Sequence, residues 1–352
     1  MTRMALIAGV TGIVGYNLAE HLAGKGWNVT GLARNPTHDI AGVTMKAADL
    51  LDEHGLERAL TGIEPTHVFF ATWSRQKTEA ENIRVNGAMM RNLLAVLQRK
   101  NTVQHFALVG GLKSFIGPFE MYGKVSPPLT PLRETLPRLD LPNFYYVLED
   151  LMFAAAARNG FSWSIHRPHT IIGHARTNVM NMGTTLAVYG TIARETGRPF
   201  RFPGNLLQWN GLTDVTDARV LAEHMAWAAT EPAARNQALH VTNGDVFRWK
   251  WLWHELARWF GVEPLPPGET TLEQQMADAA PVWDGIARKY QLAEPGLNKL
   301  ASFWHSDADL NRPFEVLTDM SKSRQMGFAG SLPSEQSFTQ LFARLRQEKI
   351  IP

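Results

Sequence analysis

The feature that most constrains the fold is a glycine-rich turn near the start of the chain. Its glycines have the spacing GxxGxxG, and it lies between an apolar run at residues 5–8 and a helical pattern at residues 14–23. Such a turn brings backbone N–H groups and a helix N-terminus close to a bound pyrophosphate. A turn without a ligand is the alternative, which the flanking strand and helix disfavour. We predict a dinucleotide site formed by Gly9, Thr11, Gly12, Ile13, Val14 and Gly15.

Short apolar runs alternate with helical patterns through the first third of the chain and a little beyond it. Strands are predicted at residues 5–8, 29–32, 67–71, 105–109 and 163–166, and helices at residues 14–23, 57–60, 79–98 and 146–158. This alternation indicates βαβ units and a parallel sheet. We therefore predict an α/β fold with a Rossmann-like doubly wound parallel sheet.

The alternation weakens after about residue 175. Helical patterns occur at residues 220–230, 250–260 and 271–290, a strand pattern at residues 239–242, and loops at residues 170–172 and 264–268. We predict that residues 1–175 form the dinucleotide-binding Rossmann domain. Residues 176–352 are then a smaller, mostly helical C-terminal cap that binds substrate, with segments at about 205–245 returning to the first domain.

The residues after the second predicted strand indicate which dinucleotide binds. An NAD site usually has an acidic residue there, whereas this chain has Arg34 followed by Asn35. A guanidinium group suits a 2′-phosphate, so we predict NADPH or NADP as the cofactor, against the alternative of a solvated surface Arg. Asp49 and Leu50 follow the third strand, where Asp49 either contacts the adenine or caps a helix.

Composition excludes several kinds of partner and site. The 352 residues include 35 Lys and Arg against 33 Asp and Glu, without a concentrated basic run, which disfavours nucleic acid. The absence of Cys excludes thiolate metal sites, and no metal-binding His–carboxylate spacing occurs. The longest charge-free stretch, residues 177–193, is too short for a membrane span, and the chain reaches its first glycine too early for a signal peptide. We expect no metal, no membrane contact and a cytoplasmic location.

The usual catalytic pair of reductases with this architecture is absent. That pair is a Tyr with a Lys four residues later, where the ammonium lowers the pKa of the phenol. None of the six Tyr residues has a Lys at this spacing. Two segments suggest a replacement: Lys113 follows a predicted strand, and Tyr145 and Tyr146 lie at a helix start. Ligands of doubly wound sheets bind beyond the carboxyl ends of the strands, where Lys113 is expected.

Motifs along nearly the whole chain carry a resemblance to a known family. They are THVFFATW at residues 66–73, KSFIGPFE at 113–120, NFYYVLED at 143–150, SIHRP at 164–168, VTNGDVFRWK at 241–250 and KIIP at 349–352. With these motifs the sequence resembles the progesterone 5β-reductase/iridoid synthase-like family of atypical extended short-chain dehydrogenases/reductases. The patterns KxxxGPFE and NFYYxxED are the most specific of the set.

The resemblance implies an enzyme that reduces the C=C bond of an activated enone or enal with NADPH. By motif position, Tyr145 and Lys113 would be the catalytic pair, and both would contact the cofactor together with Thr72, Trp73 and Ile172. Hydride would reach the β-carbon, Tyr145 would stabilise the enolate oxygen by a hydrogen bond, and Lys113 would assist. Tyr146 would then be structural, and a homodimer is implied as well.

The resemblance also implies a mainly apolar substrate pocket lined by Trp73, Phe119, Tyr122, Met180 and His305. His305 stands where the family carries an aromatic residue, so the identity of the substrate depends on what this side chain does. Asn35 stands where the family commonly has a second Arg. This change weakens the expected preference for NADPH over NADH.

Two other functions are compatible with dinucleotide binding. One is an NAD(P)-dependent carbonyl reductase or a sugar epimerase or dehydratase, against which the missing Tyr–Lys spacing argues. The other is a non-catalytic NADPH-binding sensor, which has no need for Tyr145 and Lys113 together. Enone reduction is therefore the prediction, with these two as alternatives.

Overall fold

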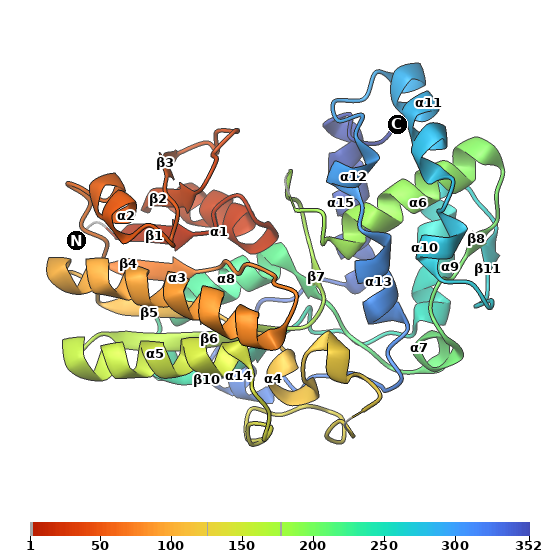
Figure 1. Ribbon diagram of the computed structural model, residues 1–352. Helices are drawn as coiled ribbons and strands as arrows, with labels where there is room; N and C mark the ends of the chain where they lie inside the picture. The colour runs from red at the N-terminus through yellow and green to blue at the C-terminus, as the bar shows by residue number, and fades with distance from the viewer. Residues whose placement is uncertain (1–2, 125, 177) are drawn as a thin grey trace.

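A parallel sheet of seven strands forms the first part of the molecule (Figure 1). The computed structural model describes residues 3–124, 126–176 and 178–352, so the first position of the charge-free stretch, 177, lies outside it. The strand order is β10-β6-β5-β4-β1-β2-β3, and every pairing is parallel. Their bounds are β1 (Met4–Ala8), β2 (Asn28–Ala33), β3 (Val43–Ala47), β4 (His67–Phe70), β5 (His105–Val109), β6 (Ser162–Pro168) and β10 (Gln237–Val241). The order reverses between β1 and β4, so the predicted Rossmann-like fold is confirmed.

Two pairs of helices cover the two faces of this sheet. One pair is α1 (Ile13–Gly24) with α8 (Ala218–Ala228), and the other is α3 (Glu79–Lys100) with α5 (Phe144–Asn159); α2 (Glu53–Ala59) packs beside α3. Strand β1 is buried on both sides: Ala5 and Ile7 belong to the core that includes α1 and α8, whereas Leu6 and Ala8 belong to the core that includes α3 and α5. Successive side chains of a strand point to opposite faces, so both layers need apolar residues here.

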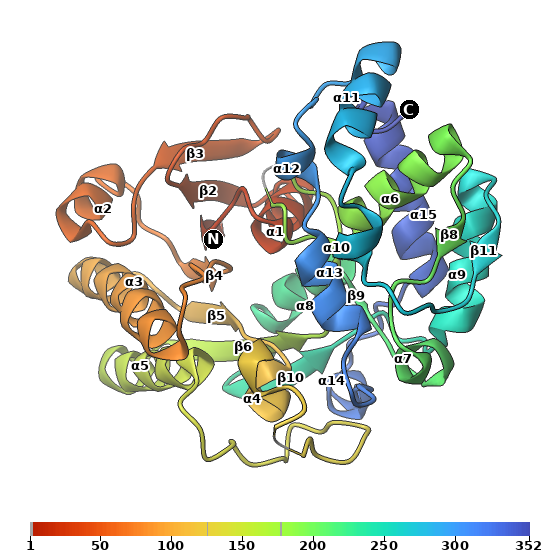
Figure 2. The same ribbon diagram turned by 45° about the vertical axis from the view of Figure 1, so that its right-hand side comes forward.

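Most of the remaining helices form a second, mostly helical part beside the sheet (Figures 1 and 2). They are α6 (Met182–Thr196), α7 (Leu206–Asn210), α9 (Trp249–Phe260), α10 (Leu272–Gln275), α11 (Ala279–Tyr290), α12 (Leu297–Leu300), α13 (Phe303–Leu310) and α15 (Ser334–Gln347). Large buried aromatic side chains hold this part together, and Phe200 stacks on Trp253 with ring centroids 4.0 Å apart. The predicted helical C-terminal region is therefore confirmed.

Three local predictions were wrong. The predicted loops at residues 170–172 and 264–268 each contain a short strand of a two-stranded sheet, in which β7 (Ile171–Ile172) pairs with β9 (Thr216–Asp217) and β11 (Pro264–Leu265) with β8 (Phe200–Arg201). Strands of two residues depend on a partner distant in sequence, so no local pattern marks them. The predicted helix at residues 271–290 is two helices, α10 and α11. Pro281 lies in the first turn of α11, a position where proline is tolerated, whereas a helix interior excludes it.

Segments from the second half of the chain add a strand and helices to the sheet of the first half. Helix α8 and strand β10 both lie within the predicted returning segment, but α7, in the same range, packs against α9 of the helical part. Helix α14 (Ser321–Gln325) also contacts β10. The domain boundary at residue 175 stays a prediction.

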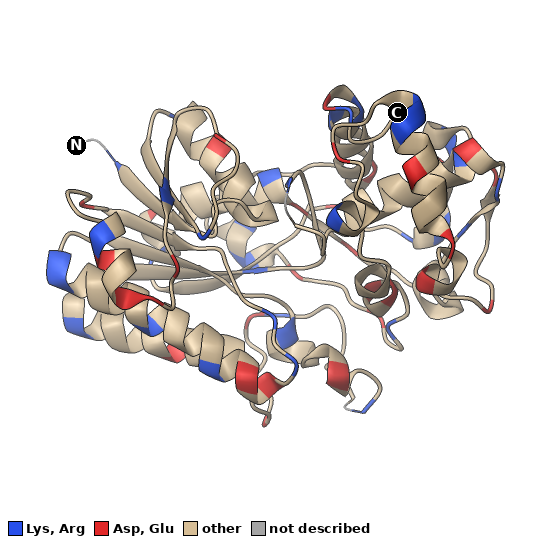
Figure 3. Cartoon of the chain, turned by 45° about the horizontal axis from the view of Figure 1, so that its top comes forward, with Lys and Arg blue, Asp and Glu red and all other residues tan. Residues whose placement is uncertain are grey.

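Positions of charged residues are interspersed over both parts of the molecule (Figure 3). In the part of the chain that the structure describes, no helix is both long and apolar enough to cross a membrane.

Candidate active site

The glycine-rich turn packs tightly against the end of β4. Gly9 has φ +89°, and a Cβ atom on it would lie 2.6 Å from the Cβ of Thr72. A Cβ atom on Gly15 would lie 2.2 Å from the carbonyl oxygen of Gly9. Both distances are shorter than atoms can approach, so the turn requires glycine at both positions. Thr72, predicted to contact the cofactor, lies directly against this turn.

Helix α1 starts from this turn with features that suit an anion. Its N-cap is Gly12, which has no side chain to accept a hydrogen bond from the helix, and its first turn contains no acidic residue. The N–H groups and the positive end of the helix dipole are thus available to an anion without a competing carboxylate in the first turn. This arrangement fits the pyrophosphate of a dinucleotide.

Arg34 and Asn35 directly follow β2, and both are exposed. Strand β2 pairs with β1, which leads into the glycine turn, so Arg34 lies one strand away from the predicted pyrophosphate site. The exposed Arg34 side chain is available to a 2′-phosphate at the carboxyl ends of the strands.

Asp49 and Leu50 follow β3 and are held by hydrogen bonds, one local and one to α3. The Asp49 carboxylate accepts a hydrogen bond from the N–H of Leu51 at 2.9 Å. The N-cap of α2 is Asp52, so the alternative role of Asp49 as that cap was wrong. The Leu50 carbonyl accepts from the Asn92 amide at 2.8 Å. The contact of Asp49 with the adenine stays a prediction.

Lys113 and Tyr145 start two neighbouring helices beyond the sheet. Lys113 is the first residue of α4 (Lys113–Ile116), four residues after the end of β5, and Tyr145 is the second residue of α5. A Cβ atom on Gly111 would lie 3.2 Å from the hydroxyl oxygen of Tyr145. The glycine after β5 therefore leaves the space that the Tyr145 ring occupies.

Asn143 links these two residues through its side chain. Its amide oxygen accepts from the backbone N–H of Tyr145 at 3.0 Å, and its amide nitrogen donates to the carbonyl of Lys113 at 2.9 Å. The neighbouring N–H of Phe144 donates to the Glu79 carboxylate at 2.6 Å. The starts of α5, α4 and α3 are thus joined around the two candidate catalytic residues.

Tyr146 has a different environment from Tyr145. Its hydroxyl donates to the carbonyl of Ser114 at 2.6 Å and accepts from the N–H of Leu139 at 2.8 Å. These are the contacts of a side chain that holds the backbone around α4 in place, which supports the structural role predicted for it.

Burial changes the protonation of both candidate residues. Burial lowers the pKa of Lys113 to about 8, although Asp309, Glu120 and Glu79 act to raise it. Its ammonium nitrogen lies 3.5 Å from the centroid of the Phe119 ring. Burial, with the nearby Glu79 carboxylate, raises the pKa of Tyr145, so its phenol stays protonated and is a hydrogen-bond donor. Among the described residues no hydrogen bond joins the Lys113 and Tyr145 side chains.

Both residues line one cleft that opens to solvent. All five residues predicted for the substrate pocket line it too, as does Ile13 of the predicted cofactor site. They are Trp73, Phe119, Tyr122, Met180 and His305. Ile172, by contrast, is fully buried in the core of the helical part, and its neighbour Ile171 lines the cleft. The role of Ile172 stays a prediction.

One wall of the cleft is polar, and sequence reasoning missed it. His169, Thr170, Asp309 and Arg312 all line the cleft, in addition to the predicted His305. Asp309 and Arg312 belong to α13 and the residues after it, and no motif surrounds them. The wall forms when the end of α13 packs against the segment after β6, so the sequence contains no local signal for it.

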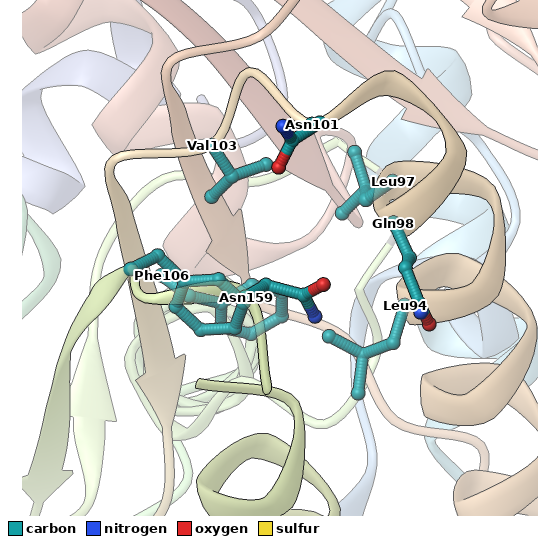
Figure 4. A pocket seen from close by; sticks show the side chains of 8 residues that line it. Leu94, Leu97, Gln98, Asn101, Val103, Phe106 and Asn159 are labelled. Atoms are coloured by element: carbon teal, nitrogen blue, oxygen red, sulfur yellow. The ribbon is translucent and has the colours of Figure 1, made fainter. Parts of the chain in front are cut away.

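A second hollow lies at the amino ends of the strands, between the end of α3 and the start of β5 (Figure 4). It is lined mainly by Leu94, Leu97, Val103 and Phe106, with Asn159 at the end of α5. Ligands of this fold bind at the carboxyl ends of the strands, so this hollow is not the candidate active site. Within the described ranges, no group of three or more His, Cys, Asp or Glu side chains could hold a metal ion.

Comparisons with known proteins agree on the fold and on a family. The model of the NAD dependent epimerase/dehydratase family matches residues 5–242. The chain is 40% identical to an (S)-8-oxocitronellyl enol synthase of Nepeta cataria and 36% identical to a 3-oxo-Delta(4,5)-steroid 5-beta-reductase of Arabidopsis thaliana, each over 99% of this chain and 93% of that enzyme. The solved UDP-glucose 4-epimerase of Thermus thermophilus in complex with NAD has a TM-score of 0.68 at 16% identity, covering 97% of this chain and 99% of that one.

Proposed function

Because this chain belongs to the NAD dependent epimerase/dehydratase family and, within it, to the progesterone 5β-reductase/iridoid synthase-like reductases, we propose that it catalyses the NADPH-dependent 1,4-reduction of an activated enone or enal. The observation that carries this function is that Tyr145, a protonated phenol, and Lys113 face one cleft at the carboxyl end of the sheet. When bound, NADPH supplies the hydride for the β-carbon of the substrate. The glycine turn, the start of α1 and Arg34 are the residues that would hold it.

Tyr145 is the residue that activates the substrate. As hydride reaches the β-carbon, negative charge develops on the carbonyl oxygen and an enolate forms. A hydrogen bond from the phenol stabilises that charge more than it stabilises the neutral carbonyl, which lowers the barrier. The raised pKa keeps the proton on Tyr145, so the phenol donates this bond without giving up its proton.

Lys113 supports the same charge from a second direction. Its ammonium lies against the Phe119 ring and within electrostatic reach of Asp309 and Glu79, which together favour its charged form against burial. A positive charge in a partly dry cleft acts on a developing enolate more strongly than it would in water. The Asn143 bridge fixes the backbone of Lys113 relative to Tyr145, so both groups stay directed at one reacting centre.

The position four residues after Tyr145 argues against the chemistry of sugar epimerases, which are frequent among the solved structures of this fold. That position is Glu149, whose buried carboxylate pairs with Arg167 at 2.8 Å and with Arg138 at 2.8 Å. A Glu in a structural ion pair cannot lower the pKa of the tyrosine or bind a ribose as a Lys does. Tyr145 therefore serves as a neutral donor and not as a base.

The test is cofactor oxidation with 2-cyclohexen-1-one, with NADPH and NADH compared, and with cyclohexanone as the matched saturated ketone. We expect NADPH to be oxidised with the enone, cyclohexanone to be the product, and the saturated ketone to be inert. Formation of 2-cyclohexen-1-ol would indicate a carbonyl reductase. Tight NADPH binding without turnover of any enone or enal would favour a sensor.

A homodimer and a cytoplasmic location stay predictions. Light scattering on the purified chain tests the first, and fractionation of cells that express the chain tests the second.

A further inference from the structure

The Asp309 carboxylate lines the cleft and accepts few hydrogen bonds from the protein. It lies near the end of α13, is 8% exposed, and lines the cleft wall. Its carboxylate accepts one hydrogen bond within the described part of the chain, from the Thr170 hydroxyl at 3.0 Å. No Lys, Arg or His nitrogen of the described residues lies within 4.0 Å of it. A buried carboxylate can accept about four hydrogen bonds. Asp309 can therefore accept further hydrogen bonds from a molecule bound in the cleft.

This carboxylate is ionised at neutral pH. Burial alone would raise the pKa of Asp309, but the charge of Arg312, the nearby His305 and His169, and the Thr170 hydrogen bond together hold it below its usual value. An ionised group with so few partners is costly inside a protein. It fits a site where a ligand, or water in its place, supplies the missing donor.

Arg312 lies beside Asp309 with its orientation fixed. Its Nε donates to the backbone carbonyl of Asp309 at 2.9 Å, and its Nη1 donates to the Nε2 of His169 at 2.7 Å. His169 is in turn held by Asp214, whose carboxylate lies 2.7 Å from its Nδ1. The remaining nitrogen, Nη2, makes no hydrogen bond to the residues that the structure describes. Arg312 is only 4% exposed and lines the cleft. Its Nη2 is therefore a hydrogen-bond donor held in a fixed position.

His305 adds a third polar group on the same face of α13, since residues four apart in a helix are neighbours. Burial lowers its pKa, so the imidazole is neutral. Its Nδ1 is buried and has no hydrogen-bond partner among the described residues. Three polar side chains with unused hydrogen-bonding capacity thus face one cleft, on elements other than those that carry Tyr145 and Lys113.

We infer that Asp309 and Arg312, with Thr170 and His305 beside them, form a subsite for a hydroxyl group that the substrate carries away from its conjugated carbonyl. A hydroxyl can donate to the Asp309 carboxylate and accept from Arg312 Nη2, so one group satisfies both the acceptor and the donor. A ketone or aldehyde at this point accepts from Arg312 but leaves Asp309 without a donor. A carboxylate is repelled by Asp309. The substrate class is thus a hydroxylated enone or enal, an inference that rests on the proposed reduction.

The experiment measures kcat/KM with NADPH for a chain-length series of 2-alkenals and of their ω-hydroxy, ω-oxo and ω-carboxy counterparts. For the chain length that spans the cleft, we expect the hydroxylated enal to exceed the unsubstituted one by about tenfold to a hundredfold, because a hydrogen bond to a charged group gives a factor of this size. The oxo compound should lie between them, and the carboxylate should be poorest.

Asp309→Asn tests the carboxylate directly. This variant should reduce the ratio of kcat/KM for hydroxylated over unsubstituted enal by about tenfold. The ratio matters because Asp309 also acts on Lys113, an effect common to both substrates that cancels. Asp284→Asn on the exposed face of α11 is the matched control and should leave the ratio unchanged.

The outcomes separate the two proposals. If no enal of any kind is reduced, the proposed function fails. If the enals are reduced but hydroxylated and unsubstituted compounds have equal kcat/KM at every chain length, the hydroxyl subsite is overturned while the reduction stands. The wild-type series decides this even if Asp309→Asn does not fold.

Discussion

At the scale of single residues, two tyrosines that are adjacent in sequence have different environments near the cleft. The Tyr146 hydroxyl is used by backbone groups of Ser114 and Leu139, whereas Tyr145 reaches the cleft past Gly111. The difference arises because neighbouring residues of a helix point about 100° apart. The motif indicated which Tyr to choose, but only the packing explains why the other one cannot replace it.

Tyr145→Phe should lower kcat/KM for enone reduction by about a hundredfold to a thousandfold, the cost of losing one donor to an oxyanion. NADPH binding, measured by fluorescence titration, should change much less than kcat/KM, because the ring is kept and only the hydroxyl that acts on the substrate oxygen is lost. Tyr290→Phe, which alters a tyrosine of α11 remote from the cleft, is the control and should keep full activity. Wild-type rates in Tyr145→Phe would exclude the proposed role.

Lys113 should make the reaction depend on pH above neutrality. Its pKa is lowered to about 8 by burial, so the ammonium is present below that pH and is lost as the pH rises through it. The kcat/KM for enone reduction should therefore fall above about pH 8, while Tyr145, with its raised pKa, stays protonated. Lys113→Arg keeps its charge at every accessible pH and should remove this fall. An unchanged pH profile in that variant would assign the fall to another group.

At the scale of elements, the site depends on how helices begin after strands. Helix α1 begins at a glycine turn, α4 begins four residues after β5, and α5 begins directly after Asn143, whose side chain caps this helix and holds the backbone of Lys113. The starts of α1 and α5 were predicted to within two residues, because the first follows a buried apolar strand and a glycine turn and the second begins a helical pattern. The four-residue helix α4 was not predicted, because it is too short to show a helical period. The two-residue strands β7 and β11 were not predicted either, because their pairing with β9 and β8 is a tertiary property.

Two substitutions of Asn143 separate its two hydrogen bonds. Asn143→Ala removes the helix cap and the bond to the Lys113 carbonyl, so it should lower the free energy of unfolding by about 1 kcal/mol. Asn143→Ser keeps a capping hydroxyl and should recover most of that loss, but its side chain is too short to reach Lys113. Both variants should lose enone reductase activity by about tenfold or more, since positioning is lost in both. Urea unfolding and kcat/KM test this, and full activity in the Ser variant would contradict it.

At the scale of the whole molecule, the parts that resist sequence analysis are those assembled from distant segments. Asp309 and Thr170 are 139 positions apart and meet only when α13 packs against the segment after β6. The same holds for a chain of side-chain hydrogen bonds through the interior. In it His105 bonds Ser162 and Ser164, Ser164 bonds His166, His166 bonds His224, and His224 bonds Ser323. Each histidine looks unremarkable in its own segment, and the network that they form exists only in the fold.

This buried network should make the stability of the whole molecule sensitive to mild acid. Burial lowers the pKa of His105 to about 3 and of His224 to about 3, and it lowers that of His166 as well. In the unfolded chain each histidine titrates near pH 6.5, so the unfolded state binds more protons below that pH. Stability should be fully present above about pH 6.5 and fall as the pH decreases below it, by about 1.4 kcal/mol per pH unit for each such histidine.

Urea unfolding between pH 7 and pH 5 measures this slope in a window above the range where most carboxylates titrate. His240 provides the matched test, because burial lowers its pKa to about 4 and its ring nitrogens make no hydrogen bond to the described residues. Only its backbone carbonyl joins the chain, by accepting from the Ser323 hydroxyl. His240→Leu removes one titrating group without breaking that chain, so the average slope over this window should decrease by about 1 kcal/mol per pH unit. A slope equal to that of the wild type would mean that His240 binds a proton in the folded state as readily as in the unfolded chain, which would contradict a neutral buried imidazole.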